Sequence, residues 1–148
     1  MLNEDKTPER VARHKKTQED FTPRSVVEML YQGAEELYTN FDLTLCDPAA
    51  GTGNILIFCL EKRLENCKNY NDVKKSISSI YGTELMEDNT LELRQRLLDY
   101  IKNNFKKLKA SQYDELASII EHNIACTDFR DWDYENWRSL KPEPVGLF

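Results

Sequence analysis

The fold is decided by the stretch Leu43-Thr44-Leu45-Cys46-Asp47-Pro48-Ala49-Ala50-Gly51-Thr52-Gly53-Asn54. Its first residues predict a short buried strand, and Asp47 stands where that strand ends. The two glycines predict a tight turn on which a ligand lies against bare backbone. A helix that begins at Asn54 would present its unpaired N–H groups to the same ligand. This order of elements is typical of a nucleoside-cofactor site.

The glycine turn alone does not identify the cofactor. A dinucleotide fingerprint requires a third glycine at the position where this chain has Leu56. The Asp47-Pro48 pair instead presents a carboxylate at the strand end, which suits a cationic amine better than a pyrophosphate. S-adenosyl-L-methionine (SAM) carries such an amine. The pattern therefore favours SAM over a nicotinamide cofactor.

Residues 47–54 resemble the first motif of the amino-methyltransferases, and especially of the N6-adenine DNA methyltransferases related to type I restriction-modification methylase subunits. The family usually writes this motif D-P-A-C-G-S-G, and Ala50 and Thr52 are small-for-small departures from it. The resemblance implies that Asp47 binds the methionine amine. It also implies cofactor contacts from the rest of the loop, at Pro48, Ala49, Gly51, Gly53 and Asn54.

A second segment of the resemblance is Gln18-Glu19-Asp20-Phe21-Thr22-Pro23-Arg24. It is similar to the family's F-T-P segment, which folds over the methionine end of the cofactor and implies contacts from Phe21 and Thr22. A hydroxyl N-cap followed by proline is also a good helix opening. We expect a helix over residues 23–38. Its apolar stripe, expected to face the core, is Val26, Val27, Leu30, Ala34 and Leu37.

Two further predicted strands each end in an acid. Residues 79–85 predict a strand ending at Glu84 and Leu85, where a carboxylate accepts from both ribose hydroxyls in such folds. Residues 122–129 predict a third strand, whose Asp128 would accept from the adenine amino group while Phe129 flanks the purine ring. Because parallel strands share one carboxyl edge, the three acids predict a single site.

Each of these residues also has a simpler explanation. Asp47 fits a turn former or a helix cap, and Glu84 fits a solvated strand end. Asp128 fits an acidic loop with its neighbours Asp131, Asp133 and Glu135. Both phenylalanines fit ordinary core positions. The order of the four segments favours the cofactor site over these separate explanations.

The predicted elements alternate between helix and strand, which indicates an α/β protein. The expected fold is a partial Rossmann-like SAM-dependent methyltransferase fold, a parallel sheet flanked by helices. We expect one domain over residues 21–148 after a polar N-terminal lead at 1–20. Further helices are expected at 54–66, at 88–109 and after a cap at Ser111, whereas residues 66–75 fit a loop or a frayed helix end. The stripe expected to pack the 88–109 helix on the sheet is Leu91, Leu98, Ile101, Phe105 and Leu108.

Composition limits the remaining possibilities. A chain of 148 residues can bury a core without disulfides, and its four cysteines contain no C-x-x-C pair. We expect reduced interior cysteines and, with two histidines, no metal. The N-terminus is charged and no apolar run is long enough to cross a bilayer, so we expect no membrane partner and a cytoplasmic protein.

The formal charge of −6 argues against binding of DNA by this chain unaided, because such affinity comes from neutralising phosphates. Two basic clusters, at residues 10–16 and 102–109, weaken this argument against DNA binding. The first fits phosphate contact or a polar lead. The second fits a solvated helix end, where cations are favoured.

One family motif is missing from the sequence. N6-adenine enzymes hold the extruded base with D/N-P-P-Y/F/W, but the prolines here, at 8, 23, 48, 142 and 144, are never adjacent. The resemblance therefore covers residues 16–129, the cofactor half, and no catalytic residue is assigned. Residues 145–148 are interpreted as a remnant of a fourth strand. Without that strand the first strand would have an open apolar edge, to be covered by the tail, by a second polypeptide or by a second copy.

Two classes of function remain. The first is the SAM-binding part of an N6-adenine DNA methyltransferase, which methylates DNA only when a second polypeptide or a missing segment completes it. The alternative is a noncatalytic module that binds SAM or pairs with another methyltransferase. A small-molecule methyltransferase is disfavoured, because little chain remains to build an acceptor site.

Overall fold

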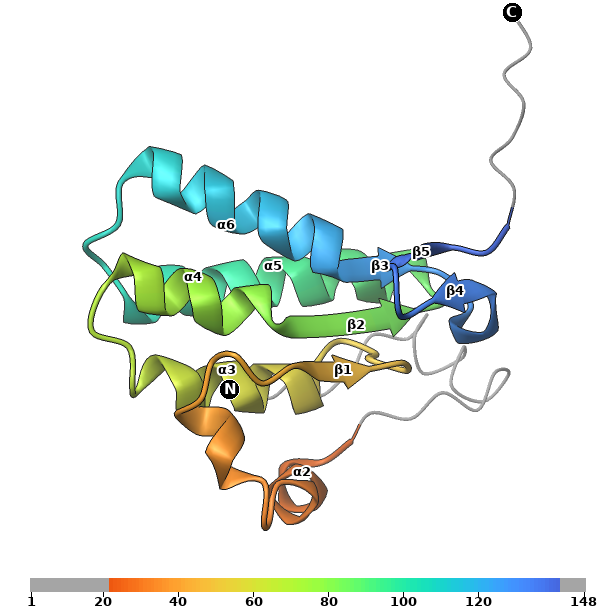
Figure 1. The fold of residues 1–148 in the computed structure, drawn as a ribbon, viewed down its shortest axis with the longest axis horizontal. Coiled ribbons are helices and arrows are strands. Elements are labelled where there is room, and N and C mark those ends of the chain that lie inside the picture. Colours follow the sequence, from red (N-terminus) through yellow and green to blue (C-terminus); the bar gives the residue numbers. More distant parts are fainter. Residues whose placement is uncertain (1–21, 142–148) are drawn as a thin grey trace, which may run out of the picture.

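The computed structural model describes residues 22–141, and its centre is a three-stranded parallel sheet. The strands are β1 (Leu45–Asp47), β2 (Ile80–Glu84) and β3 (Ile124–Cys126), in the order β1-β2-β3. Helices flank the sheet (Figure 1). The α/β class and the partial Rossmann-like architecture are therefore confirmed.

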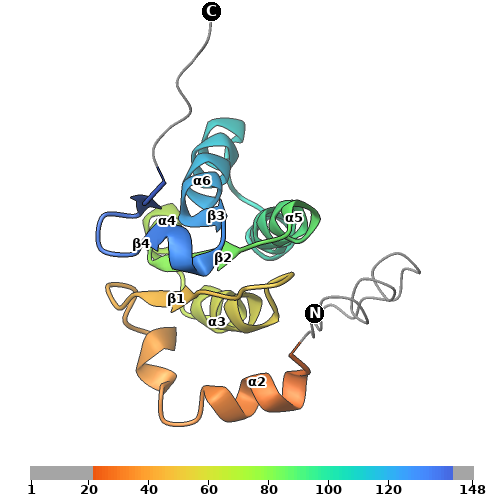
Figure 2. The same cartoon turned by 90° about the vertical axis from the view of Figure 1, so that its right-hand side faces the viewer.

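Two pairs of helices make the crossovers that parallel strands require. Between β1 and β2 run α3 (Asn54–Leu64) and α4 (Tyr70–Ser78). Between β2 and β3 run α5 (Glu87–Asn104) and α6 (Ala110–Asn123). Helices α3 and α5 contact each other and lie on one face of the sheet (Figure 2). This packing brings α5 against the loop that begins α3.

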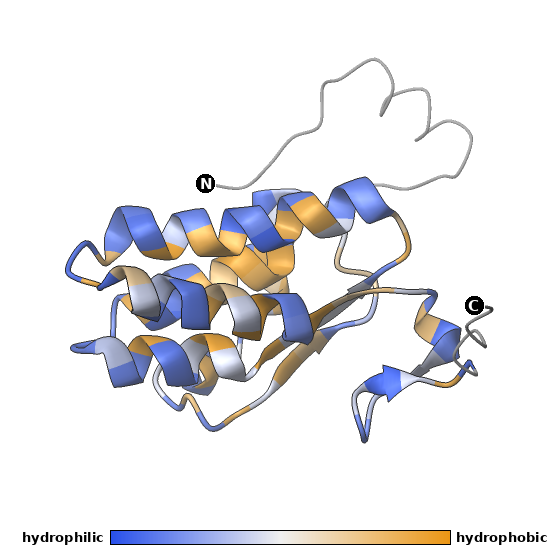
Figure 3. Cartoon of the chain, turned by 90° about the horizontal axis from the view of Figure 1, so that it is seen from above, coloured by the Kyte–Doolittle hydropathy of each residue, from blue (hydrophilic) through white to orange (hydrophobic). Residues whose placement is uncertain are grey.

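The core lies between the sheet and the helices that pack on it. On α3, α4, α5 and α6, apolar residues spaced three or four apart are buried, as an amphipathic helix requires, and the hydropathy colouring shows their inward faces (Figure 3). The fully buried leucines and isoleucines of the three longest helices are Leu56, Ile57, Leu60, Leu93, Leu97, Ile101, Leu116 and Ile120.

The helix expected over residues 23–38 is broken. Helix α2 (Arg24–Leu30) ends early, and a short 3-10 helix, η1 (Glu35–Tyr38), follows Gly33, whose φ is +83°. Glycine adopts this left-handed conformation at no steric cost, so it ends the helix. The predicted stripe is wrong at two positions, since Val26 and Leu30 are exposed. The N-cap residue is Pro23, without a side-chain cap.

Three other expected boundaries need correction. Residues 66–75, taken as a loop or a frayed helix end, instead contain the start of α4 (Tyr70–Ser78), and Asn69 caps this helix by accepting from the Asp72 N–H. Helix α5 ends at Asn104 and leaves Leu91 exposed, because its buried face runs through Leu93 and Leu97. Helix α6 has Lys109, not Ser111, as its N-cap and continues through residue 123, which shortens the third strand.

Two of the four cysteines do not lie in the interior as expected. Cys59 is buried and Cys67 is partly buried, but Cys46 and Cys126 are exposed on the sheet. Cys46 lies beside an open hollow that Tyr81 and Trp137 also line. Among residues 22–141, β1 pairs only with β2, so its other edge is uncovered there. No helix in the described part of the chain is long and apolar enough to span a membrane.

A small hairpin after the sheet was not expected from the sequence. A 3-10 turn, η2 (Phe129–Asp131), leads into β4 (Trp132–Asp133) and β5 (Arg138–Ser139), which pair antiparallel beyond the carboxyl ends of the sheet (Figure 1). The Trp137 ring packs edge-on against Tyr81, with ring centroids 4.7 Å apart. Phe21, residues 10–16 and residues 145–148 lie outside the described range.

Candidate cofactor site

The loop between β1 and α3 has the tight geometry that its glycines predicted. Gly51 and Gly53 have φ values of +59° and +96°, in the region that favours glycine. A Cβ added at Gly53 would also overlap the buried side chain of Leu93 on α5. The Ala50 N–H donates to the Thr83 carbonyl at 3.0 Å, which fixes the loop to β2.

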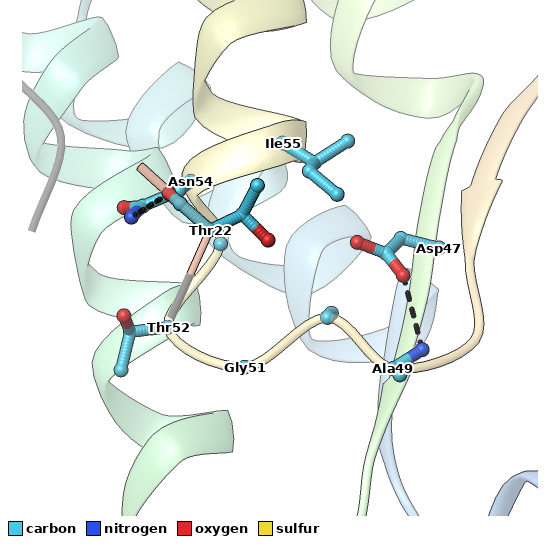
Figure 4. Close-up of a pocket in the computed structure, with 9 residues that line it drawn as sticks. Thr22, Asp47, Ala49, Gly51, Thr52, Asn54 and Ile55 are labelled. Carbon is cyan, nitrogen blue, oxygen red and sulfur yellow. Dashed lines mark hydrogen bonds between the residues drawn. The ribbon is translucent and has the colours of Figure 1, made fainter. Parts of the chain in front are cut away.

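The carboxylate of Asp47 is buried beneath this loop with one oxygen unused. Its Oδ1 accepts from the Ala49 N–H at 3.0 Å, whereas its Oδ2 is buried and has no hydrogen-bond partner within residues 22–141. Figure 4 shows that second oxygen on the side facing Thr22 and Ile55. An unpaired buried carboxylate oxygen is costly unless a ligand completes it.

A small hollow lies beside Asp47. It measures about 20 Å³, enough for one group the size of a water molecule or an ammonium. Burial raises the pKa of Asp47, and the nearby Glu84 carboxylate raises it further, while the Ala49 N–H lowers it. A cation in the hollow would oppose both effects. The residues that line the hollow are Thr22, Asp47, Ala49, Ala50, Gly51, Thr52, Gly53, Asn54 and Ile55.

The carboxylate of Glu84 faces the same loop from the end of β2. Its Oε1 accepts from the Gly51 N–H at 3.1 Å. Its Oε2 accepts from the Met86 N–H at 2.8 Å and from Asn89 Nδ2 at 3.3 Å. These bonds hold the carboxylate in one place beside the glycine turn. A carboxylate has about four lone-pair positions, so it can still accept from a ligand.

A second, larger hollow of about 220 Å³ opens beside Glu84. Its walls combine the end of β2 with the segment after β3, and two apolar side chains in them, Leu85 and Phe129, are more than half exposed. The residues that line it are Pro48, Ala49, Glu84, Leu85, Thr127, Asp128, Phe129 and Arg130. Its size and mixed lining suit part of a nucleoside.

Asp128 lines the second hollow, but Arg130 engages its carboxylate. Asp128 caps η2 by accepting from the Arg130 N–H at 2.9 Å, and the Arg130 guanidinium lies 2.7 Å from Oδ2. These contacts lower the pKa of Asp128 to about 2. The acid therefore stays ionised, and a ligand amine would share it with Arg130.

The described candidate residues thus gather at one sheet edge around two hollows that share Ala49. Thr22, Asp47 and the glycine loop surround the first, and Glu84, Leu85, Asp128 and Phe129 surround the second with Pro48. Four further residues contact or line the site and were not predicted from the sequence: Asn89, Arg96, Thr127 and Arg130. Arg130 had a local signal, since it lies two residues after Asp128. Within the described range, no three His, Cys, Asp or Glu side chains cluster to hold a metal ion.

Comparison with known proteins gives one match. Searches of curated proteins and of solved structures found no match. A family model described as N-6 DNA Methylase matches residues 9–120. The matched segment includes Thr22, Asp47 and Glu84 and ends before Asp128. Because this match covers most of the chain, the protein belongs to the N-6 DNA methylase family.

Proposed function

We propose that this chain binds S-adenosyl-L-methionine as the cofactor half of an N6-adenine DNA methyltransferase. The observation that carries the proposal is the buried Oδ2 of Asp47, which has no partner in residues 22–141, in a residue that lines a hollow the size of an ammonium. SAM has an ammonium group at its methionine end and, when bound, supplies an electrophilic methyl group. An acidic site suits this cofactor, because its sulfonium and ammonium outweigh its carboxylate.

In this proposal each hollow binds a different part of the cofactor. Asp47 accepts from the methionine ammonium in the smaller hollow, next to Thr22 and the glycine loop. Glu84 accepts from a ribose hydroxyl at the boundary between the hollows, at the acceptor position that Gly51, Met86 and Asn89 leave. Asp128 accepts from the adenine amino group, and Phe129 and Leu85 contact the purine ring. The support is the position of each residue at the edge of one of the two hollows.

Replacing Glu84 by glutamine should weaken SAM binding roughly tenfold, since hydrogen bonds to a charged group are worth about 1.5–3 kcal/mol. Glutamine keeps the side-chain size but removes one acceptor and the charge. Isothermal titration calorimetry with SAM on the wild type, Glu84→Gln and Glu84→Ala measures the effect. The matched control is Glu87→Gln, an exposed acid in the first turn of α5. Unchanged affinity in both Glu84 variants would remove this residue from the site.

We also propose that methyl transfer to adenine needs a second polypeptide or a further segment. The sequence has no D/N-P-P-Y/F motif to hold an extruded base. Within residues 22–141, β1 has one unpaired edge, which a further strand or a partner would complete. The same proposal makes the protein a cytoplasmic restriction-modification component that reaches DNA only in an assembled enzyme, since its net charge of −6 opposes DNA binding.

A purified chain of this sequence should therefore transfer no labelled methyl group from SAM to adenine in DNA. A complete N6-adenine DNA methyltransferase assayed in parallel confirms that the conditions permit transfer. Adding a polypeptide that carries the D/N-P-P-Y/F motif and binds this chain should restore incorporation. Labelled N6-methyladenine formed by the chain alone would show that its own residues build the base pocket.

A further inference from the structure

Arg96 of α5 contacts the glycine loop from the side opposite the hollow lined by Asp47. It lies one helical turn after Leu93, the residue against which Gly53 packs. Its Nη1 donates to the Thr52 carbonyl at 2.6 Å and to Asn54 Oδ1 at 3.2 Å. One guanidinium nitrogen thus joins the loop to the first residue of α3.

The contact continues from Asn54 to the segment before α2. Asn54 is buried, and its Nδ2 donates to the Thr22 carbonyl at 2.8 Å (Figure 4). Because Arg96 donates to Oδ1, the amide of Asn54 is oriented with Nδ2 toward Thr22. Arg96, Asn54 and Thr22 therefore form a relay that connects α5, α3 and the N-terminal segment.

All three residues that this relay fixes line the smaller hollow. Thr22, Thr52 and Asn54 belong to its wall, whereas none of them lines the larger hollow beside Glu84. The relay thus acts on the end of the site at which Asp47 lies.

We infer that Arg96 is a positioning residue for the amino-acid end of the bound cofactor, and that it acts by fixing the Thr52 carbonyl and the Asn54–Thr22 contact around the Asp47 hollow. This inference rests on the proposed SAM-binding function. It assigns Arg96 no contact with the cofactor. It requires that loss of Arg96 affect ligands with an amino-acid end and spare ligands without one.

The test compares two ligands that differ only at that end. S-adenosylhomocysteine has the amino-acid group, and 5′-methylthioadenosine has the same nucleoside and a sulfur but lacks it. In Arg96→Met, calorimetric affinity for S-adenosylhomocysteine should fall about tenfold, because the wall of the Asp47 hollow is no longer preorganised for the ligand. Affinity for 5′-methylthioadenosine should change less than about twofold, within the spread expected for independent sites.

Arg94→Met is the matched control, since Arg94 lies on the same helix and donates to the Ile124 carbonyl instead of to the loop. It should leave both affinities unchanged. Arg96→Lys keeps the charge but not the planar fork, and should recover part of the lost affinity. If Arg96→Met does not fold, as judged by its thermal transition, Arg96→Lys becomes the decisive variant, with a smaller but equally selective loss.

The possible results separate the two proposals. Equal losses for both ligands, or no loss for either, in the folded Arg96 variants would overturn the positioning role and leave the proposed function intact. A wild-type chain that binds neither ligand would overturn the proposed function itself. Hydrogen exchange then tests the relay alone. Faster exchange in residues 22–30 of Arg96→Met supports the relay, and unchanged exchange overturns it.

Discussion

Replacing Arg63 by methionine is expected to lower the free energy of unfolding by about 3–5 kcal/mol, because several buried or partly buried acceptors would lose a charged donor. The Arg63 side chain has no exposed surface. Its Nε donates to the Leu37 carbonyl at 2.7 Å, and its Nη2 donates to the Leu43 carbonyl at the same distance. Its Nη1 donates to the Ser76 carbonyl at 2.8 Å and to Ser79 Oγ at 2.6 Å.

These acceptors belong to four different segments. They lie in η1, in the turn before β1, in α4 and in the residue before β2, so the guanidinium fastens α3 to all of them. Burial lowers the pKa of Arg63, but an arginine pKa starts so high that the side chain stays charged at neutral pH. Methionine fills a similar volume and donates nothing. The Leu37, Leu43 and Ser76 carbonyls would lose this donor, whereas Ser79 Oγ would keep its contacts with the Phe41 and Lys75 carbonyls.

Urea unfolding at neutral pH measures this loss. Arg63→Lys should be nearly as destabilising, because a single ammonium cannot reach acceptors in so many directions. Lys62→Met, at the adjacent and partly exposed position on α3, is the control and should change stability by less than about 1 kcal/mol. A loss below about 1 kcal/mol in Arg63→Met would mean that the acceptors find other partners.

The parts of the fold that the sequence predicted are those set by neighbouring residues. The strand, acidic tip, glycine turn and helix at 43–54 are local, since a positive φ needs glycine and an apolar run next to a turn needs burial. Glu84 at the end of β2 was predicted in the same way, from the predicted strand that precedes it. The sheet edge around Asp47 and Glu84 could therefore be placed from sequence alone, as could the α/β class.

Partners distant in the sequence could not be predicted. Arg63 and Leu37 are 26 residues apart, and Arg96 and Thr52 are 44 apart, so no periodicity reveals that either arginine is buried against carbonyls. Helix α4 was missed because its composition is polar and only Val73 and Ile77 mark its inner face. The exposure of Leu91 depends on how α6 packs against α5. The periodicity of the α5 sequence alone does not reveal that packing.

The Asp47→Asn substitution is expected to reduce affinity for SAM about 100-fold, because removing one member of a buried charge pair typically costs 2–5 kcal/mol. Asparagine keeps an oxygen that can accept from the Ala49 N–H, so the loop should stay in place. What it loses is the negative charge facing the hollow. Asp42→Asn, at an exposed position just before β1, is the matched control and should bind normally.

The same substitution should not destabilise the free chain. Burial raises the pKa of Asp47 in the folded state above the ordinary value of about 3.9, so the folded chain holds this proton more tightly than the unfolded chain. The contribution of Asp47 to stability is then greatest below the unfolded pKa and is lost as the pH rises through the folded pKa. At neutral pH the buried charge is a cost, which Asp47→Asn removes.

Affinity and stability should therefore respond to pH in opposite directions. As the pH falls through the raised pKa of Asp47, wild-type affinity for S-adenosylhomocysteine should fall, because the carboxylate takes up a proton while the ligand ammonium keeps its own. Over the same interval the Asp47 contribution to stability should rise. Calorimetric titration and thermal unfolding across this range, on the wild type and on Asp47→Asn, measure both. If the variant bound SAM as tightly as the wild type, the unpaired oxygen of Asp47 would have no part in holding the cofactor. We therefore expect stability and binding to make opposite demands on this one carboxylate.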